Sequence, residues 1–221
     1  MKFLYHQAAG AHEVIVEGEG LHYIAKVRRV RVGEEIGLAS LEEEKIYHYM
    51  IESIGKKEAR LRLCGAEESL FLPRTKFHLA WAIVDPKTVE KALPMLNEIG
   101  VAKITFVITR RSQGQFRPDI DRLKRILINS CQQCGRTKLM EIEEPIDLVK
   151  VIECYPELSY LDFGGEEVQA GEGGIYLVGP EGGFAPMERE LLALQRKVGF
   201  ATTSILRSET AAVALASKIL L

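Results

Sequence analysis

The sequence lacks any apolar run close to the roughly 20 residues that a membrane-spanning helix needs. Its first six residues, M-K-F-L-Y-H, contain no apolar segment of the kind found in secretory signals. Internal repeats and low-complexity segments are also absent. With 47% apolar and 27% charged residues, the composition is that of an ordinary globular protein. We therefore expect a cytoplasmic protein with no membrane partner.

Cysteine is scarce, and its spacing argues against a metal site. Cys131 and Cys134 form a C-x-x-C pair, but Cys64 and Cys154 stand alone, so the second close pair of a zinc site is missing. The pair also falls inside a predicted helix, whereas a redox pair would follow a strand. The histidines show no ligand spacing either. We expect two thiols on one helix face and no metal.

An excess of charge of one sign is missing from the whole chain but present in parts of it. The formal net charge is -2. Residues 103–138 contain nine Lys or Arg against two Asp, whereas residues 141–172 contain ten acidic residues against one Lys. The basic stretch is either a phosphate-binding surface or a solvated helix face balanced by an acidic neighbour.

The first seventy residues have the pattern of short β-strands. We expect strands over residues 13–17, 26–32, 35–38, 46–51 and 59–63. In the second of these, apolar and basic residues alternate, so the basic side chains would share one strand face. Strands of this length and spacing predict a small barrel or an open β domain over residues 1–70.

From about residue 71 the pattern changes to strands that alternate with helices. Strands are expected over residues 76–84, 104–108, 158–163, 174–178 and 204–206, and helices over 86–99, 121–134, 186–195 and from 208 onward. Asp85 and Pro86 are typical of a helix start, and Gly100 of a helix end. Pro94 is expected to kink this helix. The alternation predicts an α/β domain over residues 71–221 with a mostly parallel sheet.

The segment Gly179-Pro180-Glu181-Gly182-Gly183-Phe184 follows a predicted strand and precedes a predicted helix. Its glycines allow close approach of backbone to a ligand, and ligands bind at the carboxyl ends of strands in open α/β sheets. The segment is neither a dinucleotide-binding fingerprint nor a P-loop. It is therefore either a loop that binds another kind of ligand or a tight structural turn.

A second polar cluster, Ser204-Ile205-Leu206-Arg207-Ser208-Glu209-Thr210-Ala211-Ala212, runs from the last predicted strand into the last predicted helix. Arg207 has the fork geometry that binds phosphates and carboxylates. Glu209 lies where the helix dipole favours a negative charge. Ser208 is expected to cap the helix.

Together, G-P-E-G-G-F and I-L-R-x-E-T-A resemble motifs of the RsmE-type SPOUT methyltransferases, which act on N3 of a uridine in 16S ribosomal RNA. His22, Val27-Arg28-Arg29 and Val32-Gly33 resemble that family's amino-terminal segment in a PUA-like RNA-binding barrel. Weaker matches lie at Glu98-Ile99-Gly100-Val101, Arg111-Ser112 and Gln133-Cys134-Gly135-Arg136. The resemblance extends over nearly the whole chain.

This resemblance implies a parallel sheet with a deep C-terminal trefoil knot and a homodimer with the cofactor site near the subunit interface. The cofactor is S-adenosyl-L-methionine, held by three loops that follow strands. The residues implied in cofactor binding are Leu161, Phe163, Gly164, Val178, Gly179, Pro180, Glu181, Gly182, Gly183, Ser204, Ile205, Leu206 and Arg207.

For the reaction, Glu181 is the candidate for cofactor or base contact and Arg207 for stabilising the uridine anion or binding its phosphate. The RNA partner is 16S ribosomal RNA within the small ribosomal subunit, with the target base turned out of its surroundings. Phosphate contacts are expected from Arg28, Arg29, Arg31, Arg110, Arg111, Arg117 and Arg136.

The chain departs from the family pattern at Ala185, at Ala201-Thr202, near Met95 and at Asn129. The alternatives are a SPOUT enzyme that acts on transfer RNA or a ribose hydroxyl, a non-catalytic RNA-binding dimer, and an enzyme of small-molecule metabolism. Cofactor binding and the identity of the modified nucleoside distinguish them.

Overall fold

The computed structural model describes residues 3–69, 75–112 and 118–221. The chain forms two compact units, of which the first comprises Met1–Leu72 with Ile128–Leu139 and the second comprises Pro73–Leu127 with Met140–Leu221. Helix α3 (Ile120–Cys134) crosses the boundary, because its C-terminal half groups with the first unit.

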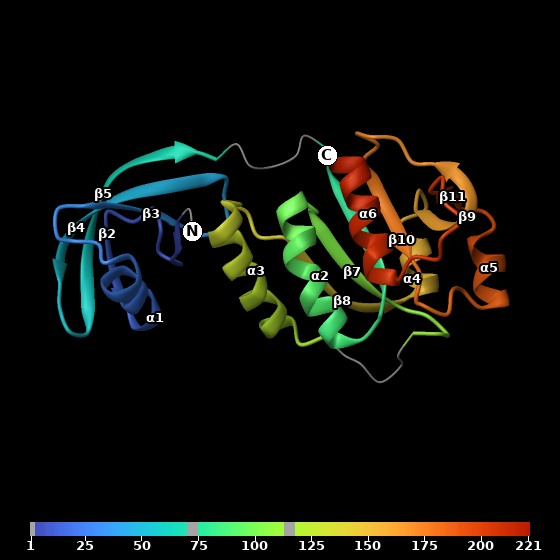
Figure 1. Ribbon diagram of the computed structural model, residues 1–221, viewed down its shortest axis with the longest axis horizontal. Helices are drawn as coiled ribbons and strands as arrows, with labels where there is room; N and C mark the ends of the chain where they lie inside the picture. The colour runs from blue at the N-terminus through green and yellow to red at the C-terminus, as the bar shows by residue number, and fades with distance from the viewer. Residues whose placement is uncertain (1–2, 70–74, 113–117) are drawn as a thin grey trace. The chain divides into compact units, whose positions relative to one another are not determined.

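The first unit is a curled, mixed sheet of five strands in the order β1-β3-β4-β5-β2. Figure 1 shows these strands with the short helix α1 against them. The core contains Leu38, Tyr49, Ile51 and Leu61. The strands are β1 (Leu4–Tyr5), β2 (Glu13–Glu17), β3 (Glu35–Ala39), β4 (Lys45–Ile54) and β5 (Glu58–Glu68).

The strand predicted over residues 26–32 is wrong. This part of the chain continues α1 (Gly18–His22) into a π-helical turn, η1 (Tyr23–Arg28), which ends at Arg29 in the left-handed conformation with φ 54°. The helical segment forms because Ile24 buries its side chain in the core. Val27 and Val32 are exposed, so the apolar residues of the alternation do not mark a buried strand face.

The second unit contains a six-stranded parallel sheet in the order β11-β9-β10-β6-β7-β8. The prediction of an α/β domain with a parallel sheet is therefore confirmed. The strands are β6 (Phe77–Ala82), β7 (Lys103–Ile108), β8 (Glu141–Asp147), β9 (Ser159–Glu167), β10 (Gly174–Val178) and β11 (Arg196–Gly199).

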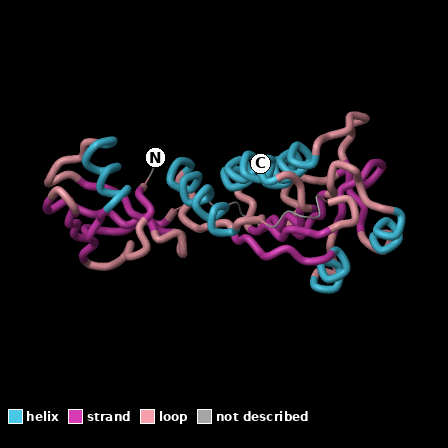
Figure 2. Tube along the Cα trace, turned by 90° about the horizontal axis from the view of Figure 1, so that it is seen from below, coloured by secondary structure: helices cyan, strands magenta, loops and turns pink. Residues whose placement is uncertain are grey.

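Helices flank both faces of this sheet, as the turned view in Figure 2 shows. Helix α2 (Pro86–Ile99) packs against α6 (Ser208–Leu220), which contacts β6 and β10. On the other face, α4 (Leu148–Cys154) and α5 (Pro186–Leu192) bury Leu148, Val151 and Leu192 against Ala80 and Leu177. None of the helices within the described ranges is long and apolar enough to cross a bilayer.

The ends of α2 form as the sequence indicates. The Asp85 carboxylate accepts the Thr88 backbone N–H at 3.1 Å, and Pro86 occupies the first helical turn, where a missing N–H costs nothing. Gly100 ends the helix with φ 107°, a conformation that a side chain would disfavour.

Near the C-terminus, the predicted strand over residues 204–206 is wrong. No strand forms there, because Ile205 is 84% exposed and Leu206 lines a pocket instead of pairing with the sheet. The edge position is taken by β11, which pairs with β9. Ser208 is not the helix cap, since Arg207 occupies that position and Ser208 begins the helix.

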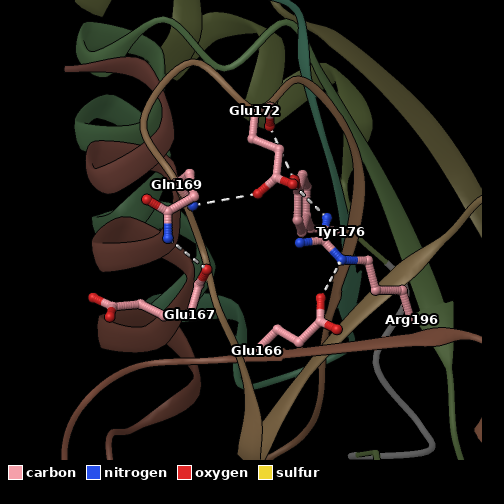
Figure 3. Close-up of polar contacts among 6 residues, drawn as sticks. All are labelled: Glu166, Glu167, Gln169, Glu172, Tyr176 and Arg196. Atoms are coloured by element: carbon pink, nitrogen blue, oxygen red, sulfur yellow. Dashed lines mark hydrogen bonds and ion pairs between the residues drawn. The ribbon is translucent and has the colours of Figure 1, made fainter.

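Polar side chains hold strand β11 to the sheet, and the strand has no apolar run. Its sequence therefore indicates a strand only weakly. Figure 3 shows Arg196 between two carboxylates, donating to Glu166 at 3.0 Å and to Glu172 at 2.6 Å. The Tyr176 hydroxyl donates to the Glu172 carbonyl at 2.9 Å. The acidic stretch is thus partly neutralised within its own unit.

At the amino ends of β6, β7 and β8, a polar cluster surrounds His78. Its ring nitrogen lies 2.7 Å from the Thr105 hydroxyl, which donates to Glu143, and Glu143 pairs with Lys103. Burial lowers the pKa of His78 to about 4, with a further contribution from Lys103 that Glu143 opposes.

We expect this histidine to make stability depend on pH. In the unfolded chain, His78 binds a proton below its ordinary pKa of 6.5. In the folded chain, it binds this proton only near pH 4. Stability that is present above pH 6.5 is therefore lost as the pH falls, by about 2 kcal/mol at pH 5. Urea unfolding of the protein and of His78→Gln at pH 7 and pH 5 measures this. Equal losses in the two proteins would contradict the assignment.

Candidate cofactor pocket

The middle of β9 and the carboxyl end of β10, together with the approach to α6, surround a pocket of about 150 Å³. This is the position at which open α/β sheets bind ligands. Three segments supply its lining, namely residues 161–163 at β9, 178–184 after β10 and 200–211 between β11 and α6. Segments far apart in the sequence therefore meet at one site.

Most of the residues predicted for cofactor binding line this pocket. They are Leu161, Phe163, Val178, Gly179, Pro180, Glu181, Gly183, Ser204, Ile205 and Leu206. Gly164, Gly182 and Arg207 were predicted with them but are not among the lining residues. The prediction omitted other residues that do line the pocket, which are Asp162, Phe184, Phe200, Thr202, Ser208 and Ala211.

The loop from Gly179 to Phe184, here termed the cofactor loop, needs glycine at two positions for different reasons. Gly183 has φ 65° and donates its N–H to the Pro180 carbonyl at 2.8 Å, which closes a tight turn. A side chain at Gly179 would begin 3.0 Å from the Phe184 ring. The loop therefore folds back closely on its own aromatic residue.

Hydrogen bonds fix both ends of the cofactor loop. At the start, the Ser208 hydroxyl donates to the Gly179 carbonyl at 2.7 Å and accepts from the indole of Trp81 at 2.9 Å. In the middle, the Arg111 guanidinium donates to the Gly182 carbonyl at 2.6 Å. At the end, the Glu188 carboxylate accepts the Ala185 N–H at 2.8 Å. The contacts of Ser208 and Arg111 are long-range, and the sequence contains no local signal for them.

The charges at the pocket are negative. Of the residues that line it, Asp162 and Glu181 are the ionisable ones. Asp162 pairs with Arg189 of α5, whereas Glu181 is exposed to solvent. Three aromatic rings, those of Phe163, Phe184 and Phe200, supply apolar surface. Such a pocket suits a ligand that combines a flat ring with a positive charge.

The proposed catalytic residue Arg207 lies directly beside the pocket but not in its lining. It occupies the cap position of α6, where its carbonyl accepts the Ala211 N–H at 2.8 Å. Its side chain is exposed and has no hydrogen bond or ion pair with the part of the chain that the structure describes. The guanidinium is therefore available to a ligand.

The arginines predicted to contact RNA differ in their surroundings. Arg28, Arg29 and Arg31 are exposed in the first unit, and Arg110 and Arg111 are exposed in the second. Arg136 differs from them, because the residue is only 2% exposed and its guanidinium donates to the Lys138 carbonyl at 2.7 Å. Arg117 lies outside the described residues.

The departures from the family pattern also have definite places. Ala185 precedes α5 with a methyl group that cannot cap it, and Glu188 instead accepts its N–H. Thr202 lines the pocket and Ala201 is exposed beside it. Met95 is exposed on α2, and Asn129 accepts a hydrogen bond from Gln132 on α3.

Cys131 is buried and Cys134 is half-buried, both on α3. Within the described ranges, no group of three or more His, Cys, Asp or Glu side chains is arranged to hold a metal ion.

Comparison with known proteins agrees with this architecture. Residues 72–220 match the RNA methyltransferase domain family, and residues 16–64 match the RNA methyltransferase PUA domain family. Ribosomal RNA small subunit methyltransferase E of Helicobacter pylori strain J99 is 35% identical, with 98% of each chain covered. The protein of the same name from Aquifex aeolicus is 30% identical, with 92% of each chain covered.

Solved structures show the same fold. A methyltransferase from Legionella pneumophila in complex with the bound cofactor SAM is 25% identical, with a TM-score of 0.82 over 98% of this chain and 95% of its own. Ribosomal RNA small subunit methyltransferase E from Neisseria gonorrhoeae, bound to S-adenosyl methionine, is 22% identical, with a TM-score of 0.83 over the same shares. By its domain matches and its full-length relatives, the chain belongs to the RNA methyltransferase family that includes the ribosomal RNA small subunit methyltransferases E.

Proposed function

We propose that the protein transfers a methyl group from S-adenosyl-L-methionine to N3 of a uridine in 16S ribosomal RNA, in the decoding region of the small ribosomal subunit. The observation that carries this proposal is the pocket between the middle of β9, the carboxyl end of β10 and the start of α6, in a chain whose full-length relatives are named as small-subunit methyltransferases.

The lining residues fit this cofactor. Its adenine is a flat ring for which Phe163, Phe184 and Phe200 offer apolar faces, and backbone groups of the cofactor loop offer hydrogen bonds to its polar edge. The sulfonium is positively charged and suits a pocket whose ionisable lining residues are Asp162 and Glu181. We assign the remaining predicted contacts, Gly164, Gly182 and Arg207, to the rim of the same site.

When bound, the cofactor supplies an electrophilic methyl group. Uracil N3 becomes nucleophilic only when its proton leaves, and we assign the role of acceptor to Glu181, an exposed carboxylate in the pocket lining. Arg207, free of ion pairs among the described residues, stabilises the negative charge that develops on the uracil or holds its phosphate. The residues that line the pocket would hold the cofactor and orient the base toward its methyl group.

We assign RNA binding to the PUA-like barrel of residues 1–70, with Arg28, Arg29 and Arg31, and to Arg110 and Arg111 of the methyltransferase domain of residues 71–221. The exposed guanidinium groups suit phosphate contacts. For a buried target, the base is turned out of the RNA toward the pocket.

Three further assignments complete the proposal. The chain between β9 and α6 is threaded as a trefoil knot, which the parallel pairing of β11 with β9 and the packing of α6 on β6 and β10 support. The protein acts as a homodimer with the cofactor site near the subunit interface. It works in the cytoplasm, where small ribosomal subunits are assembled.

The test is the transfer of labelled methyl groups from S-adenosylmethionine to small ribosomal subunits that lack the modification, followed by nucleoside analysis. We expect label in N3-methyluridine. Cofactor binding is followed separately by fluorescence of Trp81, the single tryptophan, because Ser208 links its indole to the cofactor loop. Cofactor binding without label in the subunits would indicate that the substrate is another RNA. Absence of both would leave an RNA-binding protein without this activity.

A further inference from the structure

Glu188 on α5 is a buried carboxylate that joins two segments distant in the sequence. Its side chain is in the interior, with the residue 6% exposed. One carboxylate oxygen accepts the Ala185 N–H at 2.8 Å, and the other accepts the Arg110 N–H at 2.7 Å. A buried carboxylate is retained only where it is well hydrogen-bonded, and both of its oxygens are satisfied by backbone donors.

The two segments have different tasks under the proposed function. Ala185 directly follows the cofactor loop. Arg110 belongs to the turn after β7, in which Ser112 Oγ lies 3.0 Å from the Thr109 nitrogen and 2.8 Å from its hydroxyl. Arg110 and Arg111 are exposed in this turn.

A second link reinforces the first. Arg111 donates to the Gly182 carbonyl at 2.6 Å, and its aliphatic chain lies 3.3 Å from where a Gly182 side chain would begin. Two contacts therefore hold the turn that carries the two arginines against the cofactor loop. One is the buried carboxylate, and the other is the hydrogen bond at the surface.

Building on the proposed function, we propose that Glu188 is a positioning residue that couples cofactor binding to RNA binding. A ligand that fixes the cofactor loop also fixes the turn bearing Arg110 and Arg111, because both share the Glu188 carboxylate. The RNA then meets pre-arranged arginines and loses less conformational entropy on binding. By linkage, RNA strengthens cofactor binding by the same factor.

The test compares Glu188→Gln with Glu190→Gln, an exposed glutamate on the same helix. Glutamine keeps the shape of Glu188 but has one acceptor oxygen, so its amide group faces one of the two N–H donors unpaired. Binding of S-adenosylmethionine is measured by calorimetry. Binding of undermodified small ribosomal subunits is measured with and without saturating S-adenosylhomocysteine, which cannot donate a methyl group.

In the unmodified protein and in Glu190→Gln, we expect S-adenosylhomocysteine to increase RNA affinity at least about 5-fold. In Glu188→Gln, we expect S-adenosylmethionine to bind about 10-fold more weakly and the enhancement of RNA binding to fall below about 2-fold. The variant should still unfold in one transition. Should it fail to fold, Arg111→Met removes the surface link together with one proposed phosphate contact. The ratio of the RNA affinities with and without S-adenosylhomocysteine is then expected to fall as well.

The inference is overturned if Glu188→Gln retains the full enhancement, or if the unmodified protein binds S-adenosylmethionine but shows no enhancement. A failure of the unmodified protein to bind S-adenosylmethionine would instead overturn the proposed function, and the inference with it.

Discussion

Replacing Arg207 with alanine should reduce methyl transfer by about two to three orders of magnitude while leaving the fold intact. Removing one donor that stabilises charge developing in a transition state costs about this much. The side chain is exposed and outside the pocket lining, and the backbone of Arg207, not its side chain, holds the first turn of α6. The loss should appear in kcat measured with saturating cofactor. The free energy of unfolding should stay within about 0.5 kcal/mol of that of the parent.

Thr203→Ala is the matched control, because Thr203 is an exposed residue of the same loop that does not line the pocket. It should retain full activity. Arg207→Lys separates charge from fork geometry, and we expect it to recover only part of the rate because lysine cannot form the bidentate contact. Full activity of Arg207→Ala would remove this residue from the mechanism.

Gly165→Ala should destabilise the second unit by about 2–4 kcal/mol. A side chain at Gly165 would begin 2.3 Å from the Val198 backbone carbon, closer than real contacts allow. Val198 is part of β11, which cannot move away without losing its pairing with β9. Because Phe163 of β9 and Phe200 after β11 line the pocket, cofactor affinity should fall together with stability.

Urea unfolding measures the loss, and Gly65→Ala is its control. Gly65 also lies in a strand, but a side chain there would meet nothing within 4 Å. We expect this control to stay within about 0.5 kcal/mol of the parent. A Gly165→Ala protein as stable as the control would mean that β11 is not packed as tightly as described.

The sequence predicts elements well where the deciding contacts are local. Asp85, Pro86 and Gly100 mark the ends of α2 through bonds that span a few residues. It fails where packing decides, as in η1, whose helical form depends on burying Ile24 in a core built by distant strands. Strand β8 was not predicted, because its acidic residues and Pro145 are typical of loops, but an edge strand tolerates both.

The candidate site, too, is predictable from the sequence only where its signals are local. The glycines of the cofactor loop and the polar cluster at Arg207 are visible as motifs, and the residues around them meet at one pocket. Ser208 and Glu188 carry no comparable signal. Their partners, Trp81 and Arg110, lie more than seventy residues away along the chain, so their roles depend on the completed fold.

Helix α3 shows that neither unit is one continuous stretch of sequence. The polypeptide leaves the first unit near residue 72, returns to it at residue 128 and leaves again after residue 139. A fragment that ends at residue 72 would lack Gln132, which accepts the Tyr5 N–H at 2.8 Å, and Cys131, which packs with Phe3 and Leu41. The first unit therefore cannot be exchanged between proteins as a single continuous segment. Recombination between relatives would have to transfer residues 128–139 along with it.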